Sequence, residues 1–484
     1  MYPEKLNSLA SRQVSVTAHE RFAGGLFRTK SNLEFADMPP FFRLRLIMKP
    51  VAASYTVTEI WLPDDENWNG RFVGLGNGGI AGVIQYPALA RYLRMGYACA
   101  NTDLGTSRGV VSGIDNPAVW DDFGWRATHL MTSAGKRAVG LYYGRPAQKS
   151  YFVGSSTGGQ QAISEAERFP GDYDGILSCV AAMNRTALHT YFLWNWRVMR
   201  YDGIGPAFTQ MMTEEIHRLA LEFCRGFGGA LDGDCFVSCP LDGEDTPDRF
   251  VEFIGKNSGF FKAEDLERLR DYYRGPRDPR TGKKIYGGVP IGAEISPGGM
   301  ERACKDKVVH YFPFVWAFGA GYPASDFDFA SDYDRLNEKL GPHVNATSGR
   351  LGEFSARGGK MIGFSGTADP VVPYHESLAY CDMAAKEAGG PGKLGEFFRF
   401  YVLPGRSHSS RAGAVDLFGL SDSERNRGAL AALEKWVEEG VAPFEMLAVS
   451  EADPDDTSKQ AYERVIYPYA LSEKCPFTKF AGSF

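Results

Sequence analysis

The residues with the clearest chemical potential are a serine, an aspartate and a histidine that occur in this order along the 484-residue chain. Ser156 lies in a Gly-x-Ser-x-Gly pattern, between an apolar run at residues 151–153 and a helical stretch that starts at Thr157. A strand, a sharp turn and a helix in that order form a nucleophile elbow, which exposes a serine hydroxyl at the end of a sheet. We therefore predict that Ser156 is a nucleophile.

The two glycines of this pattern have a steric role in the prediction. Gly154 and Gly158 flank Ser156, and a side chain at either position would clash where the strand and the helix approach each other. The helix begins at the turn, so its unpaired N–H groups and the positive end of its dipole point to where an oxyanion would form. The N–H of Thr157 is the expected first oxyanion donor.

Two late strands are each followed by a residue that completes an acid–base system. Asp369 follows a buried strand at residues 359–366, and His408 follows the next one at residues 397–403. The order Ser, Asp, His is that of the α/β-hydrolases. The competing interpretations are a helix cap for the aspartate and a surface position for the histidine. Chain order and strand-end position agree independently, so we predict a catalytic triad.

A glycine run follows an earlier strand and is a candidate for the other half of an oxyanion hole. Residues 73–82 contain five glycines, which let main-chain N–H groups approach a ligand without side-chain interference. The run lacks the Gly-x-Gly-x-x-Gly register and the Gly-Lys-Ser/Thr ending of nucleotide loops. We expect the N–H of Gly79 or Gly78 to serve as the second oxyanion donor.

The order of strands and helices predicts an α/β fold with a mostly parallel central sheet. Residues 42–48 and 55–62 read as strands of an antiparallel edge, and alternation of strand and helix around the elbow indicates parallel pairing. After about residue 185 this rhythm stops, and helical segments alternate with Gly/Asp/Pro loops. The predicted domains are therefore a first hydrolase part at residues 1–184, an inserted lid at 185–345 and a second hydrolase part at 346–484.

Two further features have a structural and a functional interpretation. Aromatic residues gather at 191–196 and 310–318 in the insertion, where they would roof a pocket for a flat ring or form the core of the insertion. For any single aromatic residue the core interpretation is favoured. His129 lies inside a predicted helix before the elbow, and we expect a structural rather than a catalytic role for it.

Composition limits the possible partners. The chain is 44% hydrophobic and 23% charged, and its net charge of -6 lacks the basic footprint of a nucleic-acid-binding protein. The N-terminus has no apolar leader core, and no run of about 18 apolar residues occurs, so we expect a cytoplasmic protein that does not enter membranes. Cys224, Cys235 and Cys239 lack paired C-x-x-C spacing, so no metal site is predicted. The oligomeric state stays open.

Taken together, these motifs resemble those of the tannase and feruloyl esterase family of α/β-hydrolases. The resemblance extends from residue 60 to residue 443 in family order. It rests on Leu62-Pro63, Trp68-Asn69-Gly70-Arg71-Phe72, Gly76-Asn77-Gly78-Gly79, Arg126-Ala127-x-His129, Tyr151-Phe152-x-Gly154-x-Ser156-Thr157-Gly158-Gly159, Phe169-Pro170, Tyr173-Asp174-Gly175, Asn345-Ala346-Thr347, Gly358-Gly359-Lys360, Gly366-x-x-Asp369-Pro370, Pro404-Gly405-x-x-His408 and Trp436-Val437-Glu438-x-Gly440-x-Ala442-Pro443.

The resemblance implies a serine esterase with a large lid between the elbow and the catalytic aspartate. Its expected substrates are small-molecule esters of aromatic acids, of the galloyl or hydroxycinnamoyl type, and no cofactor is needed. Two alternatives stay open. One is an esterase or acyltransferase of the same fold that acts on a different, non-phenolic ester, and the other is a non-catalytic binding protein that retains the fold.

Two departures from the family pattern alter these expectations. The family usually carries cysteines before the nucleophile and after the catalytic histidine, joined by a disulfide, whereas this chain has Ser155 and Ser409 there. Both partners are replaced together, so no orphan thiol remains and the two loops lose their covalent link. The family often has a calcium loop with regularly spaced aspartates in the lid. Around residues 230–236 this spacing is broken, so calcium is not assigned.

Overall fold

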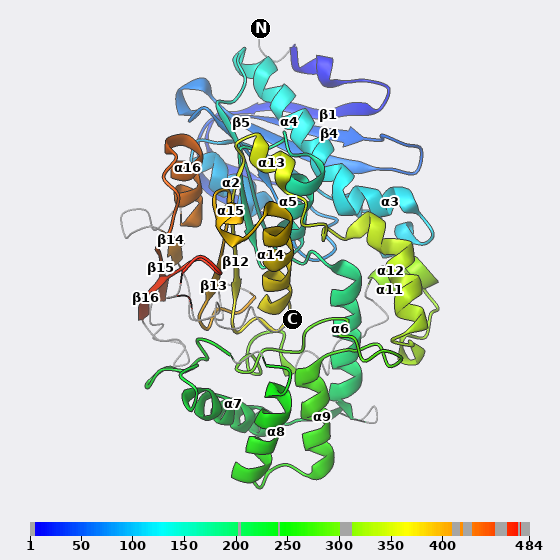
Figure 1. Ribbon diagram of the computed structural model, residues 1–484. Coiled ribbons are helices and arrows are strands. Elements are labelled where there is room, and N and C mark those ends of the chain that lie inside the picture. The colour runs from blue at the N-terminus through cyan, green and yellow to red at the C-terminus, as the bar shows by residue number, and fades with distance from the viewer. Residues whose placement is uncertain are drawn as a thin grey trace. The chain divides into compact units, whose positions relative to one another are not determined.

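The computed structural model describes residues 5–201, 205–240, 243–300, 312–408, 417–419, 428–450, 462–472 and 475 (Figure 1). The chain divides into two compact units. The first unit comprises Met1–Met183, Phe314–Gly321 and Leu340–Lys360, and the second comprises Asn184–Pro313, Tyr322–Lys339 and Met361–Phe484. The domains predicted at residues 1–184, 185–345 and 346–484 are continuous ranges, whereas each compact unit combines several segments of the chain. The predicted domain boundaries therefore stay a prediction.

The first unit contains seven strands of the main sheet, in the order β1-β4-β5-β7-β6-β8-β9. Their bounds are β1 (Val14–Phe22), β4 (Phe41–Met48), β5 (Thr56–Pro63), β6 (Arg71–Leu75), β7 (Ala98–Thr102), β8 (Lys149–Ser155) and β9 (Gly175–Cys179). Pairing is antiparallel from β1 through β4 and β5 to β7, and parallel from β7 through β6 and β8 to β9. The predicted antiparallel edge beside a parallel sheet is confirmed.

Burial explains why the middle strands read as continuous apolar runs. Every residue of β5, β7 and β9 is buried, as expected for strands covered on both faces, whereas β1 alternates between half-buried and exposed residues. Helices α2 (Tyr86–Arg94) and α4 (Ala127–Tyr143) pack against β5, β6 and β7, and α5 (Thr157–Arg168) packs against β8 and β9. The core of this unit therefore lies between the sheet and these helices.

Smaller elements complete the first unit. They are the hairpin of β2 (Gly25–Arg28) and β3 (Glu34–Met38), the short helices α3 (Pro117–Asp121) and α13 (Gly352–Ala356), and a π-helical turn at Asp122–Arg126 that leads into α4. Two helices have residues in both units, α11 (Phe312–Phe318) and α12 (Ser331–Val344). Among the described residues, none of the helices has the length and apolar character needed to cross a lipid bilayer.

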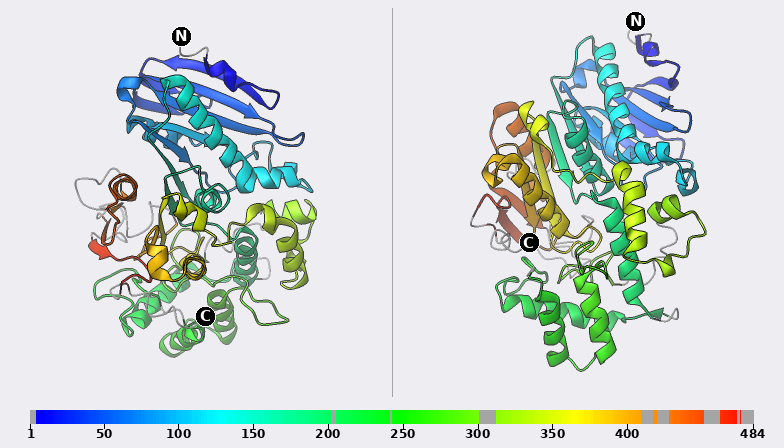
Figure 2. Two further views of the ribbon diagram at one scale, coloured as in Figure 1. Left: turned by 45° about the horizontal axis from the view of Figure 1, so that its top comes forward. Right: turned by 45° about the vertical axis from the view of Figure 1, so that its right-hand side comes forward.

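The second unit contains two parallel strands of the main sheet and a group of helices. The strands are β12 (Lys360–Gly366) and β13 (Phe398–Leu403), and the helices α14 (Tyr374–Ala388) and α15 (Pro391–Gly395) lie between them along the chain. The helices between the elbow and β12 include α6 (Arg185–Met199), α7 (Gln210–Arg225), α8 (Thr246–Asn257) and α9 (Ala263–Arg274). Helix α8 packs against both α7 and α9 (Figure 2).

Short strands complete the second unit. β10 (Arg200–Tyr201) pairs with β11 (Gly205–Pro206), and β14 (Leu417–Gly419), β15 (Met446–Ser450) and β16 (Tyr462–Ile466) form an antiparallel sheet beside α16 (Ala429–Glu439). The change from alternating strands and helices to helices and loops after residue 185 agrees with the sequence pattern. Along the whole chain the fold is α/β, with a mostly parallel main sheet.

A buried ion pair joins helix α7 to the loop before α11. The His217 ring lies with Nδ1 3.2 Å from Glu294 Oε2 and Nε2 3.2 Å from the Cys235 carbonyl oxygen. Tyr273 and the Gly292 N–H donate hydrogen bonds to the other carboxylate oxygen of Glu294. Burial disfavours the imidazolium, but the hydrogen bond and the charge of Glu294 outweigh this effect and raise the pKa of His217. Both ring nitrogens face acceptors, so the protonated ring fits this site.

Replacing His217 by glutamine is expected to lower the free energy of unfolding by about 3 kcal/mol at acid pH, because it leaves the buried Glu294 carboxylate without its cation. The raised pKa of His217 means that this stabilisation is complete below about pH 6.5, the unfolded value, and is lost as pH rises through the folded value. Urea unfolding of wild type and H217Q at several pH values measures the difference. A difference that stays constant as pH rises would contradict the assignment.

Candidate active site

Ser156 occupies a strained turn between β8 and α5. Its backbone has φ 61° and ψ −115°, in the left-handed region that residues other than glycine rarely adopt. The Ser156 N–H donates to the Cys179 carbonyl (3.0 Å), and its own carbonyl accepts from the N–H groups of Gln160 (3.1 Å) and Ala182 (3.0 Å). The strain is therefore held by main-chain hydrogen bonds on both sides, which is the expected geometry of a nucleophile elbow.

The glycines around Ser156 are required by close backbone contacts. A Cβ atom at Gly154 would lie 2.1 Å from the Gly158 carbonyl oxygen, and one at Gly159 would lie 2.5 Å from the Cys179 carbonyl oxygen. At Gly76, in the loop after β6, a Cβ atom would lie 2.5 Å from Gly158 Cα. These distances confirm the predicted reason for Gly154, since no side chain fits between the strand and the helix.

Replacing Gly154 by alanine is expected to lower the free energy of unfolding by about 3 kcal/mol or more, because the backbone of Gly158 must move to admit the methyl group. The matched control is Gly140→Ala, in helix α4, where the added methyl group meets open space. That change is expected to raise the free energy of unfolding by about 1 kcal/mol through helix propensity. Denaturant unfolding measures both, and equal effects of the two variants would contradict the steric argument.

The glycine loop after β6 is bound to the first turns of α5. The Gly158 N–H donates to the Asn77 carbonyl (2.7 Å), the Asn77 N–H donates to Gln161 Oε1 (2.8 Å), and Thr157 Oγ1 donates to the Gly79 carbonyl (2.6 Å). Within the described part of the chain, the N–H groups of Gly78 and Gly79 donate to no other residue. Two main-chain donors are thus available in a loop that is tied to the serine-bearing helix, as an oxyanion hole requires.

Gln161 and Asn77 are positioning residues that the sequence analysis did not identify. Both side chains are buried, and Gln161 Nε2 donates to Thr128 Oγ1 (2.8 Å) while Asn77 Nδ2 donates to the Thr102 carbonyl (2.8 Å). The amide of Gln161 thereby connects the glycine loop to helix α4. The available signal was the pair of polar amides at 160 and 161 on a helix that packs against a sheet.

A buried Asp369 and a half-buried His408 form an acid–base pair in the second unit. Asp369 follows β12 and is fully buried; its Oδ1 accepts hydrogen bonds from the N–H groups of Val371 (2.8 Å) and Val372 (2.9 Å). Asp369 Oδ2 lies 2.8 Å from Nδ1 of His408, which follows β13. An ionised carboxylate only accepts hydrogen bonds, so the His408 proton is assigned to Nδ1 and Nε2 is left as the basic nitrogen.

The predicted site residues are distributed over both units. Ser156, Thr157, Gly78 and Gly79 belong to the first unit, with Thr157 and Gly79 in direct contact, and the paired Asp369 and His408 belong to the second. Ser155 is the exposed last residue of β8. Ser409 lies outside the described residues, so the expected role of Ser155 and Ser409 at the site of the family disulfide stays a prediction.

His129 belongs to a separate polar cluster. Its Nδ1 lies 2.7 Å from Asp172 Oδ2, and its ring stacks on Phe169 with centroids 3.8 Å apart. Ligand atoms of His129, Asp172 and the buried Glu165 lie within 4.8 Å of one another, which is a donor set that suits a metal ion. Burial and then the charge of Asp172 raise the pKa of Glu165. The structural role expected for His129 stays a prediction.

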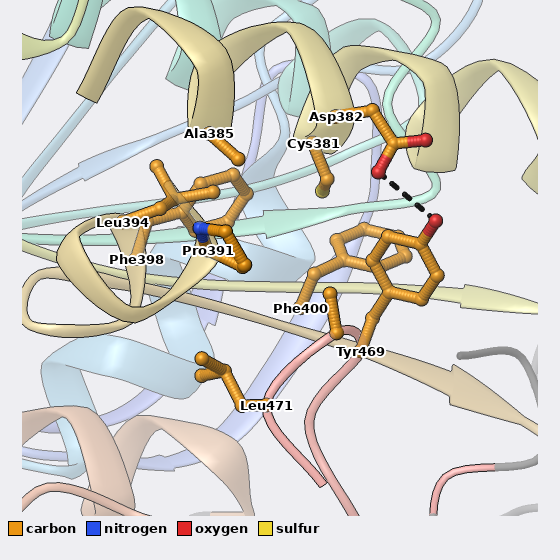
Figure 3. A pocket seen from close by; sticks show the side chains of 10 residues that line it. Cys381, Asp382, Ala385, Pro391, Leu394, Phe398, Phe400, Tyr469 and Leu471 are labelled. Atoms are coloured by element: carbon orange, nitrogen blue, oxygen red, sulfur yellow. Dashed lines mark hydrogen bonds between the residues drawn. The ribbon is translucent and has the colours of Figure 1, made fainter. Parts of the chain in front are cut away.

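A small, mostly apolar cavity lies beside β13 and α14 (Figure 3). Its polar edge is the hydrogen bond from Tyr469 to Asp382 (3.0 Å). The predicted catalytic residues do not line it, since its walls are formed by Cys381, Asp382, Ala385, Pro391, Leu394, Phe398, Phe400, Tyr469, Ala470 and Leu471. We assign this cavity to packing defects between the strand and the helix, not to the active site.

Comparison with known proteins identifies the family. A model of the family described as tannase and feruloyl esterase matches residues 48–310 and 321–474. An uncharacterized esterase of Xanthomonas campestris is 28% identical over 96% of this chain and 87% of its own length. A probable feruloyl esterase B-2 of Aspergillus flavus is 31% identical over 83% of this chain and 78% of its own length. In fold, feruloyl esterase B of Aspergillus oryzae matches with a TM-score of 0.83 at 22% identity, over 97% of this chain and 96% of that chain.

The fold and the elbow place the protein in the α/β-hydrolase class. More specifically, the chain belongs to the tannase and feruloyl esterase family, because the family model covers most of its length. It is a carboxylic ester hydrolase, and its substrate is a small-molecule ester. The resemblance expected from the sequence motifs is thereby confirmed.

Proposed function

We propose that this protein hydrolyses esters of aromatic carboxylic acids through an acyl-enzyme formed on Ser156. The observation that carries the proposal is the family match, which includes the elbow, the aspartate and the histidine in one set of matched residues. Relatives named as feruloyl esterases support an aromatic acyl group. The strained elbow and the Asp369–His408 pair supply the three chemical groups that such a reaction needs.

In the proposed first step, His408 Nε2 accepts the hydroxyl proton of Ser156 as the oxygen attacks the ester carbonyl. Asp369 keeps the Nδ1 proton in place and stabilises the imidazolium that forms. The N–H of Thr157 and the N–H of Gly78 or Gly79 stabilise the tetrahedral oxyanion, at about 3 kcal/mol for each donor. The imidazolium then protonates the leaving alcohol, which departs from the acyl-enzyme.

In the second half-reaction, water replaces the alcohol. His408 removes a proton from the water, which attacks the acyl carbon, and the same N–H groups stabilise the second oxyanion. The aromatic acid leaves when Ser156 regains its proton. Each half-reaction uses the same base and the same donors, so no cofactor takes part in this scheme.

The aromatic residues of helix α6 pack beside the aspartate loop. Tyr191 is fully buried and its ring lies 5.2 Å from that of Tyr286, while its hydroxyl donates to the Pro370 carbonyl next to Asp369 (2.7 Å). This hydrogen bond joins helix α6 to the loop that carries Asp369. Tyr191 and Tyr286 are both buried, so they belong to the core that supports the aspartate loop.

Hydrolysis of a matched ester panel tests the proposal. Methyl ferulate, methyl gallate, methyl hexanoate and p-nitrophenyl acetate are compared by kcat/KM, with feruloyl amide as the amide counterpart. We expect the aromatic methyl esters to exceed the aliphatic methyl ester at least tenfold, because only they use the apolar face of a ring for binding. Equal rates for aromatic and aliphatic methyl esters would overturn the aromatic preference, and preferential transfer to an added alcohol would indicate an acyltransferase.

A further inference from the structure

A single buried threonine hydroxyl joins three segments of the second unit. Thr367 directly follows β12, and its side chain is almost completely buried. Its Oγ1 donates to the Val237 carbonyl (2.7 Å) and accepts from the Gly405 N–H (2.7 Å). A hydroxyl has one proton and two lone pairs, so these two bonds together fix its orientation. Thr367 lies two residues before Asp369, and Gly405 lies three residues before His408.

The main chain around Thr367 brings the aspartate loop and the histidine loop into contact. The Thr367 N–H donates to the Leu403 carbonyl (3.0 Å), and the Ala368 N–H donates to the Arg406 carbonyl (3.1 Å). At Gly366 an added Cβ atom would lie 1.9 Å from the Arg406 carbonyl oxygen. With the Thr367–Gly405 bond, three hydrogen bonds therefore set the spacing of the loops that present Asp369 and His408.

The third segment is held firmly from its other side. We call residues 234–239 the anchor segment; Val237 lies within it and is buried. Arg464 of β16 donates to both carboxylate oxygens of Asp234 (2.6 and 2.8 Å) and to Ser238 Oγ (2.8 Å). Both contacts with Asp234 come from Nη2 of Arg464 and the contact with Ser238 comes from Nη1, so these charge-assisted bonds restrain the segment at two of its residues. The anchor segment is thus attached to β16 at one end and to Thr367 in its middle.

We infer that Thr367 is a positioning residue, whose hydroxyl sets the aspartate and histidine loops against the anchor segment and so fixes the geometry of the Asp369–His408 pair. This inference rests on the proposed function of that pair. The carbonyl of Val237 and the N–H of Gly405 are both main-chain groups, so they cannot adapt by rotamer changes. Loss of the hydroxyl leaves both without this partner, and the loops must shift to find others.

The test compares Thr367→Val with Thr367→Ser on an aromatic methyl ester. Valine keeps the shape but removes the hydroxyl, and serine keeps the hydroxyl. We expect T367V to lower kcat about 100-fold with little change in KM, because a small displacement of the base relative to the reacting atoms has an effect of this order. We expect T367S to retain most of the activity. The pH profile of kcat/KM is expected to shift in T367V and not in T367S.

A spectroscopic readout separates positioning from a general loss of structure. The low-field proton resonance of His408 Nδ1, assigned by its disappearance in H408A, is expected to broaden or move in T367V. If T367V does not fold, Arg464→Met provides the second test, because it loosens the anchor segment without touching either loop. R464M is then expected to lower kcat and to shift the pH profile in the same direction.

The outcomes distinguish this inference from the proposed function. If H408A is inactive but T367V keeps the wild-type kcat and pH profile, the role of Thr367 is overturned and the proposed function stays intact. Where T367V does not fold, the same result for R464M has the same meaning. An H408A variant as active as wild type would instead reject the proposed function, and the inference would fall with it. Reduced kcat, a shifted profile and rescue by serine support the inference.

Discussion

Replacing Ser156 by alanine is expected to lower kcat for an aromatic methyl ester about a million-fold, to near the rate that binding and the oxyanion donors alone sustain. The reason is that the substitution removes the hydroxyl that the strained turn between β8 and α5 presents for attack on the ester carbonyl. Initial rates of methyl ferulate hydrolysis, with mass spectrometry of the protein during turnover, measure both the loss of activity and the loss of the acyl adduct.

Ser164→Ala is the matched control for this variant. Ser164 lies on helix α5, which begins directly after Ser156; it is buried, and its hydroxyl has no hydrogen-bond partner among the described residues. Removing this hydroxyl is therefore expected to leave kcat within about twofold of wild type, because the loss of a group without a hydrogen bond disturbs the surrounding structure little. If S156A keeps a substantial fraction of the activity, or if its acyl adduct persists, then Ser156 is not the nucleophile.

The Asp369→Asn variant is expected to lower kcat about 10,000-fold at neutral pH while the protein stays folded. The contacts of the carboxylate give the reason. Oδ1 accepts two main-chain hydrogen bonds, from Val371 and Val372, so the asparagine oxygen takes this place and its amide nitrogen faces His408 Nδ1. The ring then has to accept at Nδ1 and carry its proton on Nε2, which removes the base from the position where it is needed.

Asp382→Asn provides the comparison for Asp369→Asn. Asp382 lies on α14 of the same unit and accepts a hydrogen bond from the Tyr469 hydroxyl (3.0 Å), which an asparagine oxygen also accepts. We expect D382N to retain wild-type kcat. Steady-state kinetics over a range of pH, together with unfolding curves, measure both variants. A loss in D369N no larger than that in D382N would mean that the carboxylate does not control the tautomer of His408.

The elbow was predictable because all of its determinants are local. Apolar residues at 151–153, glycines at 154 and 158 and a helix that begins at Thr157 form one continuous stretch of sequence. The same holds for Asp369 and His408, since each directly follows a buried strand, and parallel strands present their carboxyl ends at one edge of a sheet. The structure contains these strands, the strained turn at Ser156 and the contact between Asp369 and His408, and the catalytic roles of the three residues stay a prediction.

The supporting hydrogen bonds were not predictable, since they join residues far apart in the chain. Thr367 binds the carbonyl of Val237, 130 residues earlier, and Gln161 binds the N–H of Asn77, 84 residues earlier. In both contacts one partner is a main-chain group, which every residue possesses and which therefore leaves no trace in the sequence. Nor did the sequence indicate that Arg464 pairs with Asp234.

Residue types and their local order were thus enough to identify the esterase family and to predict a nucleophile and an acid–base pair, because catalytic groups need specific side chains at the ends of recognisable strands. Tertiary structure alone decided how these groups are held. The glycine loop depends on a buried amide and the aspartate and histidine loops depend on a buried hydroxyl, and such contacts arise only when packing excludes water and requires every buried polar group to find a partner.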